Sequence, residues 1–162
     1  MRSLSETLEV EIVNRTKDEI FMGEAIQLAE RASRMDEVPV GALVVLGDKV
    51  IGAASNASIK NSDPTAHAEM LAIKQASSHV GNYRLAGASL YVTIEPCTMC
   101  LGAIMHARIS RLVFGALEAK GGAVVSNDVM SIGHFNHAIE VTSGVRAEIC
   151  ARLMSDFFRR RR

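Results

Sequence analysis

The spacing of apolar residues predicts an amphipathic helix that begins at Lys17 and ends before Pro39, a residue that a helix interior does not tolerate. The residues on one stripe of this helix would face the core of the protein. They are Met22, Ala25, Ile26, Ala29 and Ala32. Residues 1–16 have weak periodicity, and we expect them to form a short extra helix or a mobile lead-in.

Beyond Pro39, short β-rich runs alternate with further helical patterns. Two of the runs are joined through Gly47-Asp48, which predicts a tight hairpin turn. The predicted strands cover 40–46, 49–54, 88–94, 111–114 and 139–142, and the predicted helices after the first cover 65–78, 98–107 and 145–158. The helix near Asp63-Pro64-Thr65 is expected to start there, because Asp or Thr can cap a helix and Pro suits its first turn.

This order of elements predicts an α/β domain with a five-stranded mixed sheet and helices on both faces, that is, a three-layer α/β/α arrangement. The hairpin would supply the antiparallel part, and the strand–helix–strand crossover after it would be parallel. The chain shows no internal repeat and no linker composition. Residues 17–162 are therefore expected to form a single domain, with residues 1–16 as an extension of unknown role.

Composition agrees with one globular domain, since 48% of the residues are apolar and 22% are charged. Eighteen basic and eighteen acidic residues balance, which argues against a uniformly basic nucleic-acid binder. The balance hides an asymmetry, because residues 1–48 hold ten acidic and five basic residues and residues 49–162 hold eight acidic and thirteen basic. The four arginines at the end of the chain would either complement the dipole of a solvated helix end or contact phosphates.

Three cysteines, Cys97, Cys100 and Cys150, do not suggest a disulfide framework. No presequence is visible, and no run approaches the ~18 apolar residues needed to cross a bilayer. We therefore expect a cytoplasmic protein that does not contact a membrane. In that setting Cys97-x-x-Cys100 indicates a metal or redox site more often than a disulfide, whereas Cys150 is expected to lie in a helix core.

Two predicted helix starts carry the strongest chemical signal. One holds His67 and Glu69, and the other holds Cys97 and Cys100. One histidine and two cysteines form a three-ligand zinc set, which leaves a fourth tetrahedral position for water, as catalytic sites require. Glu69 is poorly placed as a fourth ligand and well placed as a base that faces this water.

Two other interpretations of these residues are weaker. Cys97-x-x-Cys100 alone also fits a redox pair, but a thioredoxin-like site would not explain His-x-Glu at the preceding helix start. His106 could complete a closed structural site with four ligands. It lies six residues past Cys100, however, and therefore points elsewhere on a straight helix.

The pattern His-x-Glu followed by Pro-Cys-x-x-Cys resembles the signature of the zinc-dependent nucleobase deaminases of the cytidine deaminase superfamily. From about Lys17 onward, the chain is similar to the bacterial tRNA-specific adenosine deaminases. The similar stretches are Val38-Pro39-Val40-Gly41-Ala42, Asn56 through Asp63-Pro64-Thr65-Ala66-His67-Ala68-Glu69, Asn82-Tyr83-Arg84-Leu85, Leu90-Tyr91-Val92-Thr93-Ile94-Glu95-Pro96-Cys97, His106-Ala107-Arg108-Ile109 and Asp156-Phe157-Phe158-Arg159.

The resemblance implies a cytidine-deaminase-like fold and the hydrolytic deamination of adenosine to inosine at the wobble position of a tRNA anticodon loop. It implies that His67, Cys97 and Cys100 hold one Zn²⁺ per subunit. A zinc-activated water would attack C6 of the base, with Glu69 as the proton shuttle. It further implies a homodimer that acts on arginine tRNA with an ACG anticodon.

For the substrate, the resemblance implies that Asn56 hydrogen-bonds the flipped nucleoside and that Ala68 offers it backbone contacts. Aromatic and basic side chains would meet the flanking RNA. They are Phe157, Phe158, Arg159, Arg161 and Lys120. Two departures limit the comparison: Glu118 stands where the family usually has Asp, and residues 121–133 diverge.

The chemistry of the substrate agrees with this resemblance, because a base in an anticodon loop leaves its stack more readily than a base in a duplex. A free-base or nucleoside deaminase, such as a guanine or cytosine deaminase, would share the zinc chemistry but gain little from the basic tail. A zinc module that binds RNA without catalysis would have no use for Glu69.

Overall fold

The computed structural model describes residues 4–133 and 135–162, with side chains from Lys17 onward. The elements are α1 (Leu4–Arg34), β1 (Gly41–Leu46), β2 (Lys49–Ser55), α2 (Ala68–Val80), β3 (Ser89–Ile94), α3 (Thr98–His106), β4 (Arg111–Ala116), α4 (Val129–Ile132), β5 (Glu140–Thr142) and α5 (Ala147–Arg159). Among these described helices, none has the length and apolar character that a bilayer crossing requires.

The strands form a single five-stranded sheet in the order β2-β1-β3-β4-β5. Strand β1 pairs antiparallel with both β2 and β3, whereas β3, β4 and β5 run parallel. The hairpin through Gly47-Asp48 and the parallel crossover from β3 through α3 to β4 are therefore confirmed.

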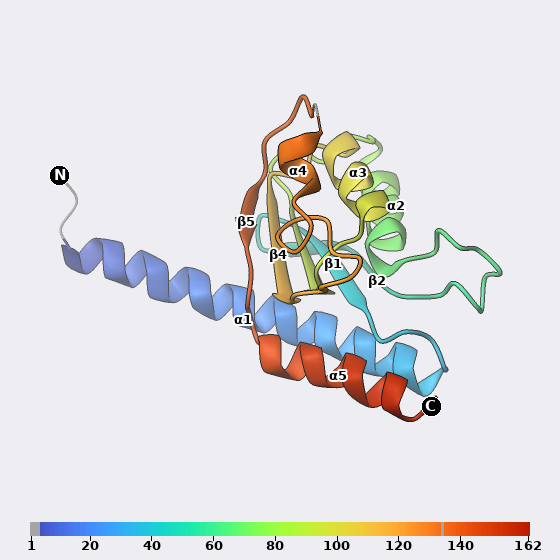
Figure 1. Cartoon of the computed structure of the whole chain (residues 1–162). Coiled ribbons are helices and arrows are strands. Elements are labelled where there is room, and N and C mark those ends of the chain that lie inside the picture. The colour runs from blue at the N-terminus through green and yellow to red at the C-terminus, as the bar shows by residue number, and fades with distance from the viewer. Residues whose placement is uncertain (1–3, 134) are drawn as a thin grey trace.

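Helices α1 and α5 cover one face of this sheet, and α2 and α3 cover the other (Figure 1). Because successive side chains of a strand point to opposite faces, β3 contributes Leu90 and Val92 to one core and Tyr91 to the other. All five residues of the stripe predicted for α1 are buried, each at 5% exposure or less. The predicted three-layer α/β/α arrangement is confirmed.

Two glycines let the helices approach the sheet closely. A Cβ atom on Gly41 of β1 would lie 2.0 Å from the carbonyl oxygen of Ala25 in α1. A Cβ atom on Gly52 of β2 would lie 2.3 Å from the carbonyl oxygen of Ala72 in α2. Any larger residue at either position would push the neighbouring helix away from the strand. At Gly52 it would also displace the residues of α2 that follow His67.

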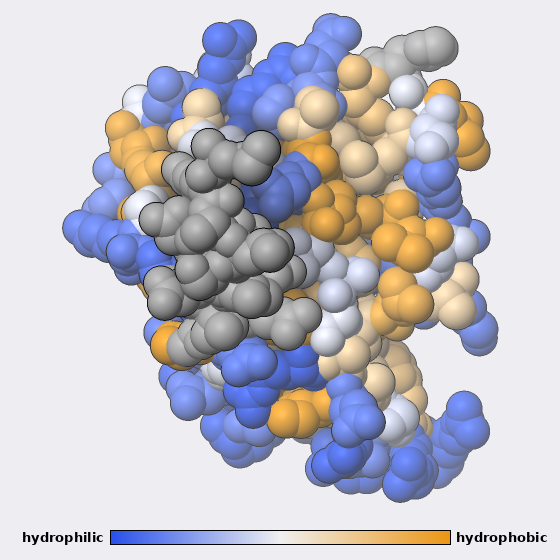
Figure 2. All heavy atoms as spheres, turned by 90° about the vertical axis from the view of Figure 1, so that its left-hand side faces the viewer, coloured by the Kyte–Doolittle hydropathy of each residue, from blue (hydrophilic) through white to orange (hydrophobic). Residues whose placement is uncertain are grey.

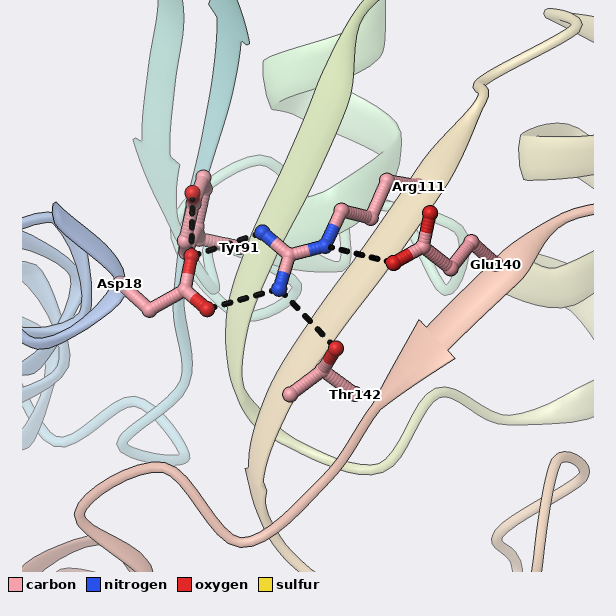
Figure 3. A network of polar contacts seen from close by, with 5 residues as sticks. All are labelled: Asp18, Tyr91, Arg111, Glu140 and Thr142. Carbon is pink, nitrogen blue, oxygen red and sulfur yellow. Dashed lines mark hydrogen bonds and ion pairs between the residues drawn. The ribbon is translucent and has the colours of Figure 1, made fainter. Parts of the chain in front are cut away.

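An ion pair between Asp18 of α1 and Arg111 of β4 joins the helix to the sheet (Figure 3). Both oxygens of Asp18 accept hydrogen bonds of 2.7 Å from Arg111, and the hydroxyl of Tyr91 donates a third of 2.8 Å. Arg111 also donates to Thr142 and pairs with Glu140 at 3.6 Å. Burial alone would raise the pKa of Asp18, but the bonds and charge of Arg111 and the bond from Tyr91 outweigh it and lower that pKa.

Three local predictions differ from the structure. Helix α1 is continuous from Leu4, so residues 4–16 form neither a separate short helix nor a lead-in without helical structure; residues 1–3 lie outside the described part of the chain. Helix α2 begins at Ala68 and not near Thr65. The carboxylate of Asp63 accepts hydrogen bonds from the N–H and the hydroxyl of Thr65, and so closes a turn before the helix instead of capping it. The short helix α4 was not predicted; the Asp128 carboxylate accepts the Ser131 amide at its start.

Candidate active site and metal centre

The three proposed metal ligands come from the starts of two neighbouring helices. His67 occupies the N-cap position of α2, and Cys97 occupies the N-cap position of α3. Both have extended backbone angles and neither side chain caps its own helix, so both side chains are free to point into the space between the helix ends. Cys100 follows in the first turn of α3 and is fully buried.

The spacing of these side chains fits a metal ion. Nδ1 of His67 lies 3.7 Å from Sγ of Cys97 and 3.5 Å from Sγ of Cys100. In a tetrahedral zinc site with usual bond lengths, a nitrogen and a sulfur ligand lie about 3.6 Å apart. The described residues bring together only this group of three, and exposed His106 in the last turn of α3 is not part of it.

The surroundings of Cys97 favour the thiolate form of its side chain. Hydrogen bonds from Cys100 and then from His67 lower the pKa of Cys97 to about 3. The bond to Cys97 and burial raise the pKa of Cys100, and the bond to Cys97 raises the pKa of His67. A divalent cation at this position would displace the remaining protons, since thiolate and neutral imidazole are the forms that bind metal.

Glu69 lies two residues past His67 and is only 3% exposed. Burial raises the pKa of its carboxyl group to about 6. A carboxyl group with this pKa can take up and release a proton near neutral pH, which suits a general acid–base catalyst. The structure therefore places a carboxyl group suited to proton transfer beside the three proposed metal ligands.

These residues open onto a cavity of about 270 Å³. Its lining residues are Val38, Val40, Asn56, His67, Glu69, Ile94, Glu95, Cys97, Glu118, Gly121 and Met154. Ile94, Glu118 and Met154 also line a second cavity of about 890 Å³, so the two are contiguous. We call the first the catalytic cavity and the second the outer cavity.

The substrate-binding residues that the sequence suggests do not all line the same cavity. Asn56, at the end of β2, lines the catalytic cavity, whereas Ala68 is fully buried as the first residue of α2. The outer cavity is lined by the remaining candidates except Phe157. They are Lys120, Phe158, Arg159 and Arg161.

Phe157 and Phe158 are neighbours on α5 whose ring centroids lie 5.3 Å apart, but they differ in exposure. Phe157 is 5% exposed, whereas Phe158 is 46% exposed. The guanidinium of Arg161 lies 4.2 Å above the ring of Phe157 and donates to the carbonyl of Asp36 at 2.7 Å. The RNA contacts of Phe157 and Arg161 stay predictions, and in this structure the two side chains join α5 to the end of α1.

Two buried acidic residues, Glu37 and Glu95, were given no role in the sequence analysis. Glu37 accepts the amides of Ile59 and Lys60, in the loop that follows Asn56. Glu95 accepts amides from the segment after β4. For Glu95 the available signal was an acidic residue at the end of an apolar run, where burial demands hydrogen-bond donors.

Comparison with known proteins places this site in a family. Residues 16–162 match the profile of the MafB19-like deaminases. A tRNA-specific adenosine deaminase of Haemophilus influenzae is 50% identical over 147 residues, which cover 90% of this chain and 85% of that protein. A protein of the same name from Bacillus subtilis is 45% identical, over 89% of this chain and 90% of that one.

Solved structures agree with these sequence relatives. One, from a study of A-to-I editing by tRNA:A34 deaminases at the wobble position, superposes with a TM-score of 0.80 at 45% identity and covers 82% of this chain and 97% of its own. A guanine deaminase of Bacillus subtilis gives a TM-score of 0.60 at 34% identity, over 73% of this chain and 71% of that one. The chain belongs to the family of the tRNA-specific adenosine deaminases, within the MafB19-like deaminases.

Proposed function

We propose that this protein hydrolyses adenosine to inosine at the wobble position of tRNA. The observation that carries the proposal is the placement of Glu69 beside His67, Cys97 and Cys100, at a cavity that adjoins a second cavity lined by basic side chains. The relatives named tRNA-specific adenosine deaminase and the structure described as a tRNA:A34 deaminase support the same substrate.

The metal in this proposal is one Zn²⁺ per subunit, because two thiolates and an imidazole form a set that zinc prefers. Bound there, zinc would lower the pKa of water and so supply a nucleophile at neutral pH. Glu69 takes one proton from the water that attacks C6 and passes it to N1 of the ring. It then takes the remaining proton from the oxygen now bonded to C6 and delivers it to the amino group, so that the C6–N bond breaks, ammonia departs and the C6 carbonyl of inosine forms.

The remaining residues bind and orient the nucleoside. Asn56 lies on the wall of the catalytic cavity, where its amide can donate to and accept from a purine. A base that leaves its stack in the anticodon loop would enter this cavity, and flanking nucleotides would lie in the outer cavity against Phe158 and Lys120. Arginine tRNA with an ACG anticodon is the substrate we expect, and a tRNA substrate agrees with a cytoplasmic location.

We further propose that the protein acts as a homodimer with RNA bound across both subunits. Apolar side chains are exposed in and around α4, with Val125 at 51% and Ile132 at 81%. Figure 2 shows apolar side chains gathered over part of one face of the molecule. Exposed apolar surface of this kind is typical of an interface with another protein.

The test is to incubate the zinc-loaded protein with arginine tRNA bearing an ACG anticodon and to sequence the product. We expect inosine at the wobble position and ammonia in equal amount. Absence of inosine from zinc-loaded, folded protein would refute the proposal.

A second candidate is a guanine deaminase, because a structure of that name shares the fold at 34% identity. Free guanine serves as the competing substrate in the same assay. Turnover of guanine without any inosine in tRNA would favour this candidate.

A further inference from the structure

The segment 118–126 follows β4 and forms part of the wall of both cavities. Glu118 and Gly121 line the catalytic cavity, and Lys120 lines the outer cavity. The segment contains no helix or strand, so no regular hydrogen-bond ladder fixes its shape. Whatever holds this segment in place also shapes the pocket for the substrate.

The carboxylate of Glu95 binds both ends of the segment. Its Oε1 accepts hydrogen bonds from the amide of Glu118 at 3.0 Å and from the hydroxyl of Ser126 at 2.5 Å. Its Oε2 accepts three consecutive amides, from Val124 at 3.1 Å, Val125 at 2.7 Å and Ser126 at 2.9 Å. Glu95 is 3% exposed, so these donors replace water around a buried charge.

Only a carboxylate of this length suits the position. Every hydrogen-bond partner of Glu95 in the described part of the chain is a donor, and an ionised carboxylate offers acceptor sites alone. A glutamine would turn its own N–H₂ group toward backbone amides and leave donors without partners. An aspartate would be one methylene short of the same donors.

Gly122 gives an independent sign that the segment is wrapped around Glu95. A Cβ atom on Gly122 would lie 2.3 Å from Cδ of Glu95 and 2.5 Å from the carbonyl oxygen of Glu118. The backbone therefore passes the carboxylate at a distance that only glycine permits.

Other hydrogen bonds of the segment stay within it or beside it. The carboxylate of Glu118 accepts the amides of Lys120 and Gly121, and the side chain of Asn127 donates to the carbonyl of Gly122 at 3.0 Å. Glu95 differs because it connects the segment to the residues that follow β3 and carry Cys97. The only other bond that we find across this boundary in the described chain runs from the Ala123 amide to the Pro96 carbonyl, at 2.9 Å.

We propose that Glu95 is a positioning residue of the deamination site, which holds segment 118–126 as the wall of the substrate pocket. The reaction itself rests on the proposed function above. Glu95 takes no part in proton transfer and acts on the substrate through the segment that it binds.

The experiment compares Glu95→Gln with wild type in the zinc-loaded full chain. We expect amide hydrogen exchange to become about 10-fold faster in 118–126 and kcat/KM on an anticodon stem-loop to fall about 100-fold, because small displacements of the pocket misplace the reacting base. Zinc content is expected to stay at the wild-type level, since His67, Cys97 and Cys100 keep their positions.

Asp18→Asn is the matched control, because Asp18 is a buried carboxylate with hydrogen bonds that lines neither cavity. Asp18→Asn is expected to lower Tm while exchange in 118–126 and kcat/KM stay within about 2-fold of wild type. A role of Glu95 in stability alone would make the two variants alike in kcat/KM, which would overturn the proposal. The proposal would also be overturned if the amides of 118–126 in Glu95→Gln exchanged at the wild-type rate.

Ser126→Ala keeps the test decisive if Glu95→Gln does not fold. It removes one hydrogen bond to Oε1 of Glu95. As in Glu95→Gln, amide exchange in 118–126 is expected to become faster and kcat/KM to fall, here by about 3-fold each. No change in either quantity would overturn the proposal. If wild type forms no inosine, the proposed function fails, and the exchange measurement alone decides whether Glu95 holds the segment.

Discussion

At the scale of single residues, the positions of His67 and Cys97 explain how two helices bring together side chains that could hold a metal ion. N-cap positions usually carry Ser, Thr, Asp or Asn, whose side chains satisfy the free amides of the first turn. Here neither N-cap side chain makes a capping hydrogen bond to its own helix. The free amides and the positive ends of the two helix dipoles then favour thiolates at Cys97 and Cys100.

Glu69 belongs to the same scale, and its role can be tested by Glu69→Gln. We expect kcat for inosine formation to fall about 10³-fold, because the amide keeps the volume of the side chain but cannot transfer a proton. Zinc content and Tm are expected to match wild type, since Glu69 is not one of the three clustered ligands. Metal analysis and single-turnover kinetics measure the two effects separately.

His67→Ala provides the contrast, because it removes a ligand and is expected to lower zinc content. An activity of Glu69→Gln within about 3-fold of wild type would contradict the assigned role. It would favour the alternative of a zinc module that binds RNA without catalysis.

At the scale of elements, the sequence predicts those features that depend on local pattern. The stripe of α1 and the five strands follow from apolar spacing, and His67, Glu69, Cys97 and Cys100 follow from a short motif. The start of α2 does not, because Asp63 and Thr65 are good capping residues that satisfy each other instead. The role of Glu95 could not be predicted from local pattern either, because its hydrogen-bond partners lie more than 20 residues further along the chain.

The contact between α1 and the sheet leads to a prediction about acid stability. The pKa of Asp18 is lowered in the folded protein, so its ion pair stabilises the fold above the unfolded value of about 4 and loses that contribution as the pH falls further. Asp18→Asn is expected to lower the free energy of unfolding by about 2 kcal/mol at pH 7 and by less below pH 4. Denaturant unfolding at both pH values measures the difference.

The control for this prediction is Lys17→Ala, beside Asp18 on α1, which removes an exposed ion pair with Asp48 in the turn between β1 and β2. That variant is expected to change stability by less than about 1 kcal/mol. A loss in Asp18→Asn that is the same at pH 7 and at pH 3 would show that the ionised carboxylate is not what stabilises the contact.

At the scale of the whole molecule, a net charge of zero conceals how charge is distributed. The C-terminal arginines lie beside the end of α1, where Arg161 pairs with Asp36 and Arg160 donates to Ser33 (Figure 1). Arg159 lies on the outer cavity with a side chain that is 75% exposed, and its partner Asp156 is 3.5 Å away. Arg160 and Arg161 of the basic tail therefore join two helices, whereas Arg159, Arg161 and Arg162 line the outer cavity.

This division leads to different outcomes for Arg159→Ala and Arg161→Ala. We expect Arg159→Ala to weaken tRNA binding and to reduce the slope of log K against log salt by about 1, with no change in Tm, because it removes one phosphate contact. Arg161→Ala is expected to flatten the slope as well, and also to lower Tm, because it removes the stack on Phe157 and the bond to Asp36. Binding measured from about 50 to 200 mM salt, beside thermal melts, separates the two effects, and Lys17→Ala serves as a control that lines neither cavity. A wild-type slope for Arg159→Ala would mean that this arginine only solvates a helix end.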